Sequence, residues 1–159
     1  MKRFVTIPIL LIIGVLMLTF TSCGDIDVEE DNDEMPYSVS YTVNEYFPGY
    51  AVSKSIKLDD GNYSITIKDG PTFVLKPVNE NTYGPYAALI SYTGNGDPMP
   101  VNLATDKLPQ PVVDYLLGLE MINQIFDMWQ KGTVMTVSAG SSTPISITYD
   151  NVTGTIVQL

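Results

Sequence analysis

The sequence predicts an α+β fold, a tandem repeat of one unit in which a short helix is followed by antiparallel strands. Two helical stripes of apolar residues occur, and each precedes runs in which apolar and polar residues alternate. Such alternation is typical of antiparallel strands with one buried and one solvated face. Alignment of the chain with itself, at an offset of about 70 residues, indicates the repeat. It matches residues 45–50 with 114–119, 65–70 with 135–140 and 73–75 with 145–147, which divides a domain over 36–159 into repeats of about 36–106 and 107–159.

Each repeat is expected to open with a short helix. In the first repeat, Pro48 and Gly49 end the apolar stripe and stop the helix. In the second, Pro109 and Pro111 stand at the start, where a missing N–H costs little, and Gly118 is expected to form a left-handed C-cap. The stripes consist of Val39, Val43, Tyr46 and Phe47 in the first helix and of Val112, Val113, Leu116 and Leu117 in the second.

Strands are expected after each helix, separated by turns rich in Asp, Asn, Gly and Pro. In residues 51–58, Val52, Ile56 and Leu58 are expected to share the buried side. Residues 121–129 are ambiguous, because their apolar spacing fits a continued helix whereas the repeat predicts a strand. We favour the strand, since the repeat fixes the elements on both sides. The remaining strands are expected at 63–68, 72–76, 87–92, 133–138, 144–149 and 155–159.

The N-terminal residues form a targeting signal. Lys2 and Arg3 precede an apolar run over residues 4–18, and the only cysteine, Cys23, follows two small residues. This order resembles the signal peptide of bacterial lipoproteins, with residues 1–22 removed and Cys23 lipidated. A transmembrane anchor is the alternative, because residues 4–20 are about long enough to span a thinned bilayer. The position of the lone cysteine at the end of the run favours the lipoprotein.

An acidic stretch follows the cysteine. Residues 24–34 contain seven carboxylates, whose mutual repulsion keeps a chain extended, so residues 23–35 are expected to act as a tether. An acidic run at this place resembles the export signal that carries lipoproteins of Bacteroidota to the outside of the outer membrane. The expected location is therefore the outer membrane, with the protein lipid-anchored and exposed at the cell surface.

Composition argues against several classes of function. The full chain has a net charge of −10, and no arginine remains after residue 3, which is unfavourable for nucleic-acid binding because that depends on neutralising phosphates. The absence of histidine removes the commonest general base and nearly every zinc site. Two carboxylate pairs are candidates for acid–base catalysis, Asp59 with Asp60 and Asp114 with Glu120. The sequence gives no reason to expect the two carboxylates of either pair to lie close together. We therefore expect no enzymatic activity, no metal and no cofactor.

Four short motifs occur in a distinctive order: Tyr-Phe-Pro-Gly at 46–49, Asp-Asp-Gly at 59–61, Lys-Asp-Gly at 68–70 and Leu-Pro-Gln-Pro at 108–111. In this order and spacing the chain resembles the PepSY-like, β-lactamase-inhibitor-protein-like lipoproteins of Bacteroidota over residues 36–159. The second repeat departs from the family pattern at 118–119 and 138–140. The resemblance implies one curved sheet with helices on one face. It implies no reaction, and the inhibitory role of a distant relative does not transfer with a fold.

The solvated face of the sheet is the main candidate surface. An ordinary face of β-favouring Ser and Thr is the alternative. In the loop before the fourth strand, Tyr83 and Tyr86 are of a type that often anchors ligands, with packing back over the sheet edge as the alternative. Trp129 is expected in the core rather than as a sugar platform. The face is expected to present Ser64, Thr66, Lys68, Thr72, Lys76, Thr136, Ser138, Ser146 and Thr148.

Two functions follow from these expectations. The first is a surface-anchored, non-enzymatic lipoprotein that binds or inhibits a protein partner through its sheet face and loops. The alternative is a glycan-binding accessory lipoprotein of an outer-membrane uptake system, with Tyr83, Tyr86 and Trp129 stacking on sugars. Exposure of these aromatic side chains along one concave strip would favour glycan binding, and their burial would argue against it.

Overall fold

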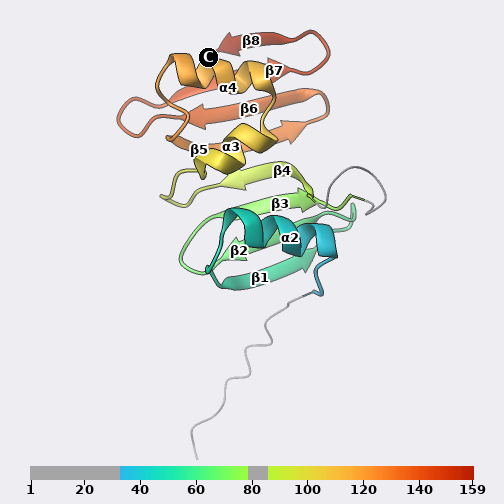
Figure 1. Ribbon diagram of the computed structural model, residues 1–159. Coiled ribbons are helices and arrows are strands. Elements are labelled where there is room, and N and C mark those ends of the chain that lie inside the picture. Colours follow the sequence, from blue (N-terminus) through green and yellow to red (C-terminus); the bar gives the residue numbers. More distant parts are fainter. Residues whose placement is uncertain (1–32, 79–85) are drawn as a thin grey trace, which may run out of the picture.

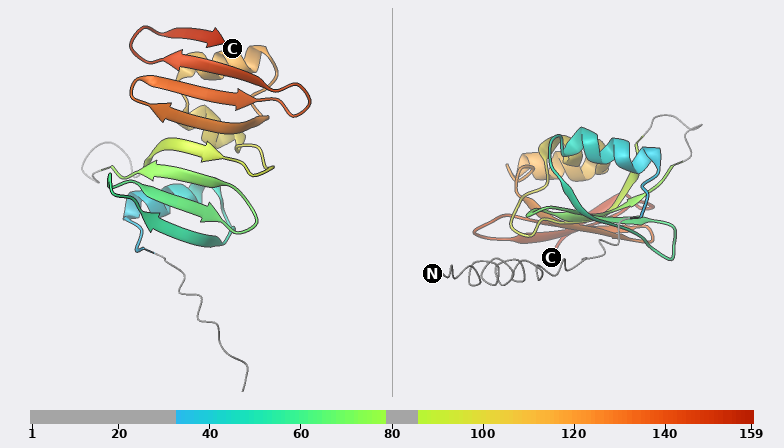
Figure 2. Two further views of the ribbon diagram at one scale, coloured as in Figure 1. Left: turned by 180° about the vertical axis from the view of Figure 1, so that it is seen from behind. Right: turned by 90° about the horizontal axis from the view of Figure 1, so that it is seen from below.

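The computed structural model describes residues 33–78 and 86–159. Within these residues, eight strands form one antiparallel sheet in the order β1-β2-β3-β4-β5-β6-β7-β8, so that each strand pairs with its neighbours in the chain. Three helices lie against one face of the sheet (Figures 1 and 2). The predicted α+β class, with a curved antiparallel sheet and helices on one side, is confirmed. We call the side that carries none of the described helices the open face.

The strands predicted from alternation lie within one residue of their expected bounds, and only the segment 121–129 departs further. The helices are α2 (Tyr37–Tyr46), α3 (Val101–Lys107) and α4 (Gln110–Gly118). The strands are β1 (Val52–Lys57), β2 (Tyr63–Ile67), β3 (Thr72–Lys76), β4 (Ala88–Thr93), β5 (Ile125–Lys131), β6 (Val134–Ala139), β7 (Ile145–Asp150) and β8 (Thr155–Gln158).

The core lies between the helices and the inner face of the sheet. Val39 of α2 and Leu116 of α4 are fully buried, as their apolar stripes predict. Just after α2, the ring of Phe47 stacks on that of Phe73 in β3, with centroids 4.8 Å apart and planes 10° apart. The end of α2 and the sheet are thus held together by an aromatic stacking contact in addition to the burial of apolar surface.

The predicted inward side of the first strand is wrong beyond Val52. A bulge at Ser53 shifts the register, so that Val52 pairs with Ile67 but Ser55 pairs with Ile65. Ser55 therefore faces the core and is 2% exposed, whereas Ile56 lies on the open face. One inserted residue exchanges the two faces of a strand, because side chains alternate with a period of two.

The second repeat differs from expectation where α4 ends. Residues 121–124 form turns, and the strand begins only at Ile125, so the preference for a strand over 121–129 is correct for its later part. Gly118 is helical, and the left-handed residue is Glu120, with φ 59°. Leu117 is 51% exposed and does not belong to the buried stripe.

The sequence patterns do not predict helix α3. It follows Pro98 and Pro100, and it buries Leu103 and Ala104. The first half of the described chain has no counterpart to it. The self-alignment also fails to preserve strand pairing, because Ile65 pairs with Phe73 whereas the aligned Met135 pairs with Tyr149.

The two edges of the sheet differ. Asp33 lies along β1, where its N–H donates to the Ser55 carbonyl at 2.8 Å and its carboxylate accepts from the Lys57 N–H at 2.6 Å. Strand β8 has no pairing partner on its outer side among the described residues. The structure shows no helix, within the ranges it describes, that is long and apolar enough to cross a membrane. The predicted signal peptide (1–22), Cys23 and all but the last residues of the tether lie outside those ranges.

Candidate functional site

A continuous row of side chains crosses the open face. Direct pairing aligns one outward residue from each of the eight strands, and the row carries no charge. Small hydroxyl residues alternate along it with apolar ones as far as Thr136, which is followed by a second threonine, Thr148. In strand order the row is Ile56, Ser64, Val74, Ser91, Trp129, Thr136, Thr148 and Val157.

The expectation that Trp129 lies in the core is wrong. Its side chain is 46% exposed on the open face, between Ser91 and Thr136. Val134 and Val157, which also point to this face, are 39% and 47% exposed. The exposed large apolar residues of this face thus gather on β5 to β8. We define the outer patch as Trp129, Val134, Thr136, Thr148 and Val157.

The sheet residues predicted for binding lie on the open face, but they are less accessible than expected. Ser64 and Thr66 are half-buried. Thr136 is only 9% exposed and lies between its pairing partners Trp129 and Thr148. The Thr66 hydroxyl is hydrogen-bonded to that of Thr72 at 3.2 Å. The exposed Lys68 lies beyond the end of β2, in the turn to β3. The open face therefore offers Trp129 and aliphatic side chains more than hydroxyl groups.

The predicted aromatic strip for glycan binding does not form from Tyr86 and Trp129. Tyr86 lies on the helical side of the sheet, where its ring meets that of Tyr41 edge-on with centroids 5.2 Å apart. It also lies 6.2 Å from the ring of Tyr46, likewise on α2. Tyr86 therefore contacts α2 through two tyrosine rings, while its side chain stays 37% exposed. Tyr83 falls outside the described residues.

A lysine stands over these tyrosines. The Lys107 ammonium, at the end of α3, lies 4.5 Å from the centroid of Tyr86 and 5.4 Å from that of Tyr46. The Tyr46 hydroxyl donates to the Asp106 carboxylate at 3.0 Å. Burial, followed by this hydrogen bond, raises the pKa of Tyr46 above its usual value. Burial lowers the pKa of Lys107, and the Asp106 charge opposes that effect.

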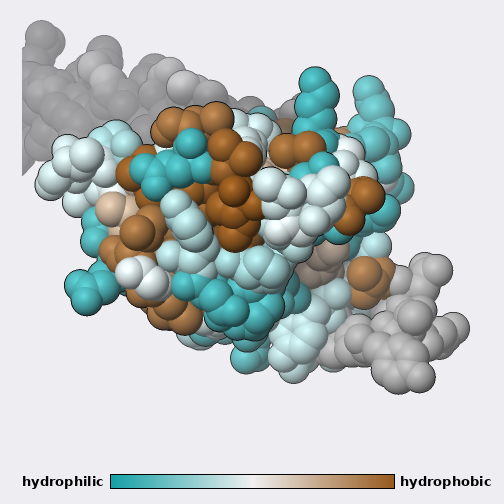
Figure 3. Space-filling model, turned by 90° about the horizontal axis from the view of Figure 1, so that it is seen from above, coloured by the Kyte–Doolittle hydropathy of each residue, from teal (hydrophilic) through white to brown (hydrophobic). Residues whose placement is uncertain are grey.

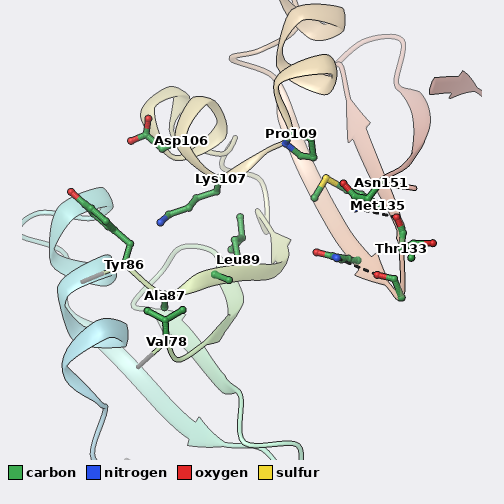
Figure 4. Close-up of a pocket in the computed structure, with 13 residues that line it drawn as sticks. Val78, Tyr86, Ala87, Leu89, Asp106, Lys107, Pro109, Thr133, Met135 and Asn151 are labelled. Carbon is green, nitrogen blue, oxygen red and sulfur yellow. Dashed lines mark hydrogen bonds between the residues drawn. The ribbon is translucent and has the colours of Figure 1, made fainter. Parts of the chain in front are cut away.

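A pocket of about 540 Å³ opens beside this cluster (Figure 4). Its apolar part includes Ala87 and Leu89 at the start of β4 and Met135 of β6. Gln130 and Asn151 supply amide groups on the other side, where the Asn151 side chain donates to the Thr133 carbonyl at 3.0 Å. Among the described lining residues, Lys107 is the only cation and the adjacent Asp106 the only anion, so the charged groups of the pocket lie together at one end.

Apolar side chains also gather at the end of the molecule formed by α4 and β8. Figure 3 views the molecule from this end and shows hydrophobic residues between hydrophilic ones. Leu117 and Leu119 at the end of α4 are 51% and 41% exposed, and Val152 and Leu159 beside β8 are 75% and 76% exposed. Val157 of the outer patch is also part of β8.

Two of the acidic residues considered for catalysis accept local hydrogen bonds. Asp60 accepts hydrogen bonds from the backbone and side chain of Asn62, and Asp114 accepts one from Gln110. Both carboxylates thus support local structure. Among residues 33–78 and 86–159, no group of three or more His, Cys, Asp or Glu side chains could hold a metal ion.

Two features were missed from the sequence, and only one had a local signal. Asp127, Trp129 and Lys131 alternate with Met128, and this period of two indicates an outward tryptophan. The cluster of Tyr46, Tyr86 and Lys107 joins α2, the start of β4 and α3, so no local pattern could reveal it. No protein-family model matches the chain, and no curated protein matches it.

Proposed function

We propose that this chain is a lipid-anchored, non-enzymatic binding protein whose outer patch docks on another protein. The observation that carries the proposal is the exposure of Trp129 near the middle of the open face of the eight-stranded sheet. Tryptophan is enriched among residues that dominate protein interfaces, especially where polar neighbours surround it. Val134 and Val157 extend the apolar contact. Thr136 and Thr148, which lie between them, have small side chains that leave Trp129 and the valines accessible to a partner.

The size of the open face fits a protein partner. Eight strands at about 4.8 Å spacing span roughly 34 Å, and five residues along a strand span about 17 Å. The flat area of the face is therefore about 580 Å². Stable interfaces bury about 800 Å² on each partner, so the partner would also contact the turns at the margin of the face. A small ligand would leave most of it uncovered.

Charge further narrows the class of partner. Residues 35–159 contain six lysines and eleven acidic residues. In the described strands, three lysines point to the open face, Lys54, Lys76 and Lys131, and two acids do so, Asp127 and Asp150. The open face is therefore much less acidic than the rest of the domain. We propose a partner with an apolar recess for Trp129 and acidic groups at its margin.

The proposal also includes a location in the cell and a protein family. The lipoprotein signal with Cys23 and the acidic tether support an outer-membrane lipoprotein at the cell surface, similar to the PepSY-like lipoproteins of Bacteroidota. The recurrence of one helix followed by four strands, α2 with β1–β4 and α4 with β5–β8, supports an ancestral duplication. Aligning Ile65 with Val137 rather than with Met135 keeps the pairing of Phe73 equivalent to that of Ile147. Replacement of Cys23 by serine should abolish incorporation of a labelled fatty acid.

The test is quantitative capture of the tagged full-length protein from its native outer membrane after mild cross-linking, followed by mass spectrometry. Trp129→Ala should lower recovery of one abundant partner at least 30-fold, the loss expected of a residue worth about 2 kcal/mol in an interface. Tyr37→Ala is the matched control, since Tyr37 is 56% exposed but lies on α2, on the other side of the sheet. Equal recovery with both variants would refute docking on the outer patch.

Recovery of background proteins alone would refute a stable protein partner. Glycan binding by Trp129 would then be the favoured function, since its neighbours Ser91 and Thr136 carry hydroxyl groups that can form hydrogen bonds with sugars. A glycan array probed with the unmodified protein and with Trp129→Ala would test this second function directly.

A further inference from the structure

Lys107 lacks a carboxylate partner in the part of the chain that the structure describes. Its ammonium is half-buried at the end of α3 and lies over the faces of Tyr46 and Tyr86. The adjacent Asp106 carboxylate accepts the Tyr46 hydroxyl instead, and Figure 4 shows its side chain directed away from the pocket. A cation–π contact satisfies none of the three ammonium donors as a carboxylate would.

The pocket beside Lys107 has an apolar part formed by buried residues. Ala87, Leu89 and Met135 are each at most 5% exposed and contribute to its lining. The amide groups of Gln130 and Asn151 engage the turn between β5 and β6, through bonds to the carbonyls of Gly132 and Thr133. The opposite wall is thus polar but uncharged. A volume of about 540 Å³ lies within the range of small-molecule sites.

We propose that this pocket binds a small amphipathic carboxylate, with the anionic head at Lys107 and the apolar body over Leu89 and Met135. A partly desolvated ammonium attracts an anion more strongly than one in water does, because its charge is less screened. The lowered pKa of Lys107 agrees with this desolvation. The site lies on the helical side of the sheet and is separate from the outer patch, so neither proposal depends on the other.

The probe is phenylacetate, and phenethylamine is its matched control, because the two share a phenyl body and differ in the charge of the head. The purified full chain would be labelled with ¹³C at its methionine methyl groups and followed by NMR. Among the seven methionines, Met135 lines the pocket, and its signal is assigned with Met135→Leu. Phenylacetate should shift this signal saturably, and phenethylamine should not. Equal shifts with both probes, or none with phenylacetate, would overturn the proposal.

Substitution tests the role of the ammonium. Lys107→Met should weaken phenylacetate binding at least tenfold, whereas Lys57→Met, at an exposed lysine outside the lining, should leave it unchanged. Unchanged binding in Lys107→Met would overturn the proposal. N-acetylphenylalanine distinguishes the source of the carboxylate: tighter binding than phenylacetate would indicate the C-terminus of a peptide, and weaker binding a free acid.

A measurement on the unmodified protein guards against a variant that fails to fold. Among the described residues, the titratable groups facing Lys107 are the phenols of Tyr46 and Tyr86 and the carboxylate of Asp106. The pKa values of both phenols are raised, that of Tyr86 chiefly by its hydrogen bond with Tyr41, so they stay protonated while Lys107 loses its proton. The affinity for phenylacetate should therefore fall as the pH rises from 7 to 10. A constant affinity over this range would contradict a role for the Lys107 charge.

Discussion

Gly94, at the end of β4, should not tolerate a side chain. A Cβ at this position would overlap the backbone oxygen of Asp97 and lie 3.1 Å from the carbonyl oxygen of Phe126. The Gly94 N–H donates to that same Phe126 carbonyl at 2.7 Å, and its own carbonyl accepts from the Asp97 N–H at 2.9 Å. The backbone is therefore close to Gly94 on both sides. We predict that Gly94→Ala destabilises the junction between β4 and β5.

The magnitude follows from what must move. Relieving an overlap in a packed site costs about 1–3 kcal/mol. The Asp97 oxygen that has to shift also accepts the hydroxyl of Tyr92 at 3.3 Å, and Tyr92 is 1% exposed. Leaving that hydroxyl unpaired costs a further 1–3 kcal/mol or so. With partial relaxation, Gly94→Ala should lower the free energy of unfolding by about 3 kcal/mol and the melting temperature by roughly 10 °C.

Gly118 supplies the matched control. It is helical and exposed, and a Cβ added to it would have no atom within 4 Å. Gly118→Ala should raise the free energy of unfolding by about 0.5 kcal/mol, because alanine has less conformational freedom to lose. Urea unfolding followed by circular dichroism measures both variants. A change of less than about 0.5 kcal/mol for Gly94→Ala would refute the steric reasoning.

Two further predictions concern the core and the phenols. Ile65→Ala should lower the free energy of unfolding by about 2–5 kcal/mol, whereas Ile56→Ala, on the open face, should cost less than about 1 kcal/mol; equal losses in urea unfolding would contradict the assigned bulge. The raised pKa of Tyr46 means that the unfolded chain loses this proton first, so stability should fall as the pH rises above 10. Tyr46→Phe should flatten that decline between pH 9 and 11, and Tyr50→Phe, at a side chain 64% exposed, should not; identical profiles for the two variants would refute the assignment.

Local patterns predict most of this fold. Alternation locates seven strands to within a residue because each has one buried and one solvated face, and the sheet pairs neighbours in sequence. The errors have specific causes. The bulge at Ser53 inverts the faces of β1, which no alternation pattern can show. Helix α3 is only seven residues long and buries two of them, Leu103 and Ala104, too few for a clear periodic signal.

The candidate sites are less predictable because each is formed by residues that lie far apart in the sequence. The outer patch requires the register of β5 to β8, which sets Trp129 beside Thr136. The pocket requires α3 to bring Lys107 over Tyr46, 61 positions earlier in the chain. The sequence gives the residue types of both sites, but it does not show that these residues lie close together in the fold.

The alternation of the sheet makes the two proposed sites separable by experiment. Met135 and Thr136 are adjacent in β6, yet Met135 lines the pocket and Thr136 belongs to the outer patch. Thr136→Glu should therefore weaken partner capture, since it places a charge beside Trp129, and should leave phenylacetate binding within about twofold, since sites that share no contacts behave additively. Met135→Leu should leave capture intact. A loss of both activities in Thr136→Glu, with urea unfolding unchanged, would mean that the two faces communicate through β6 and that the sites are one functional unit.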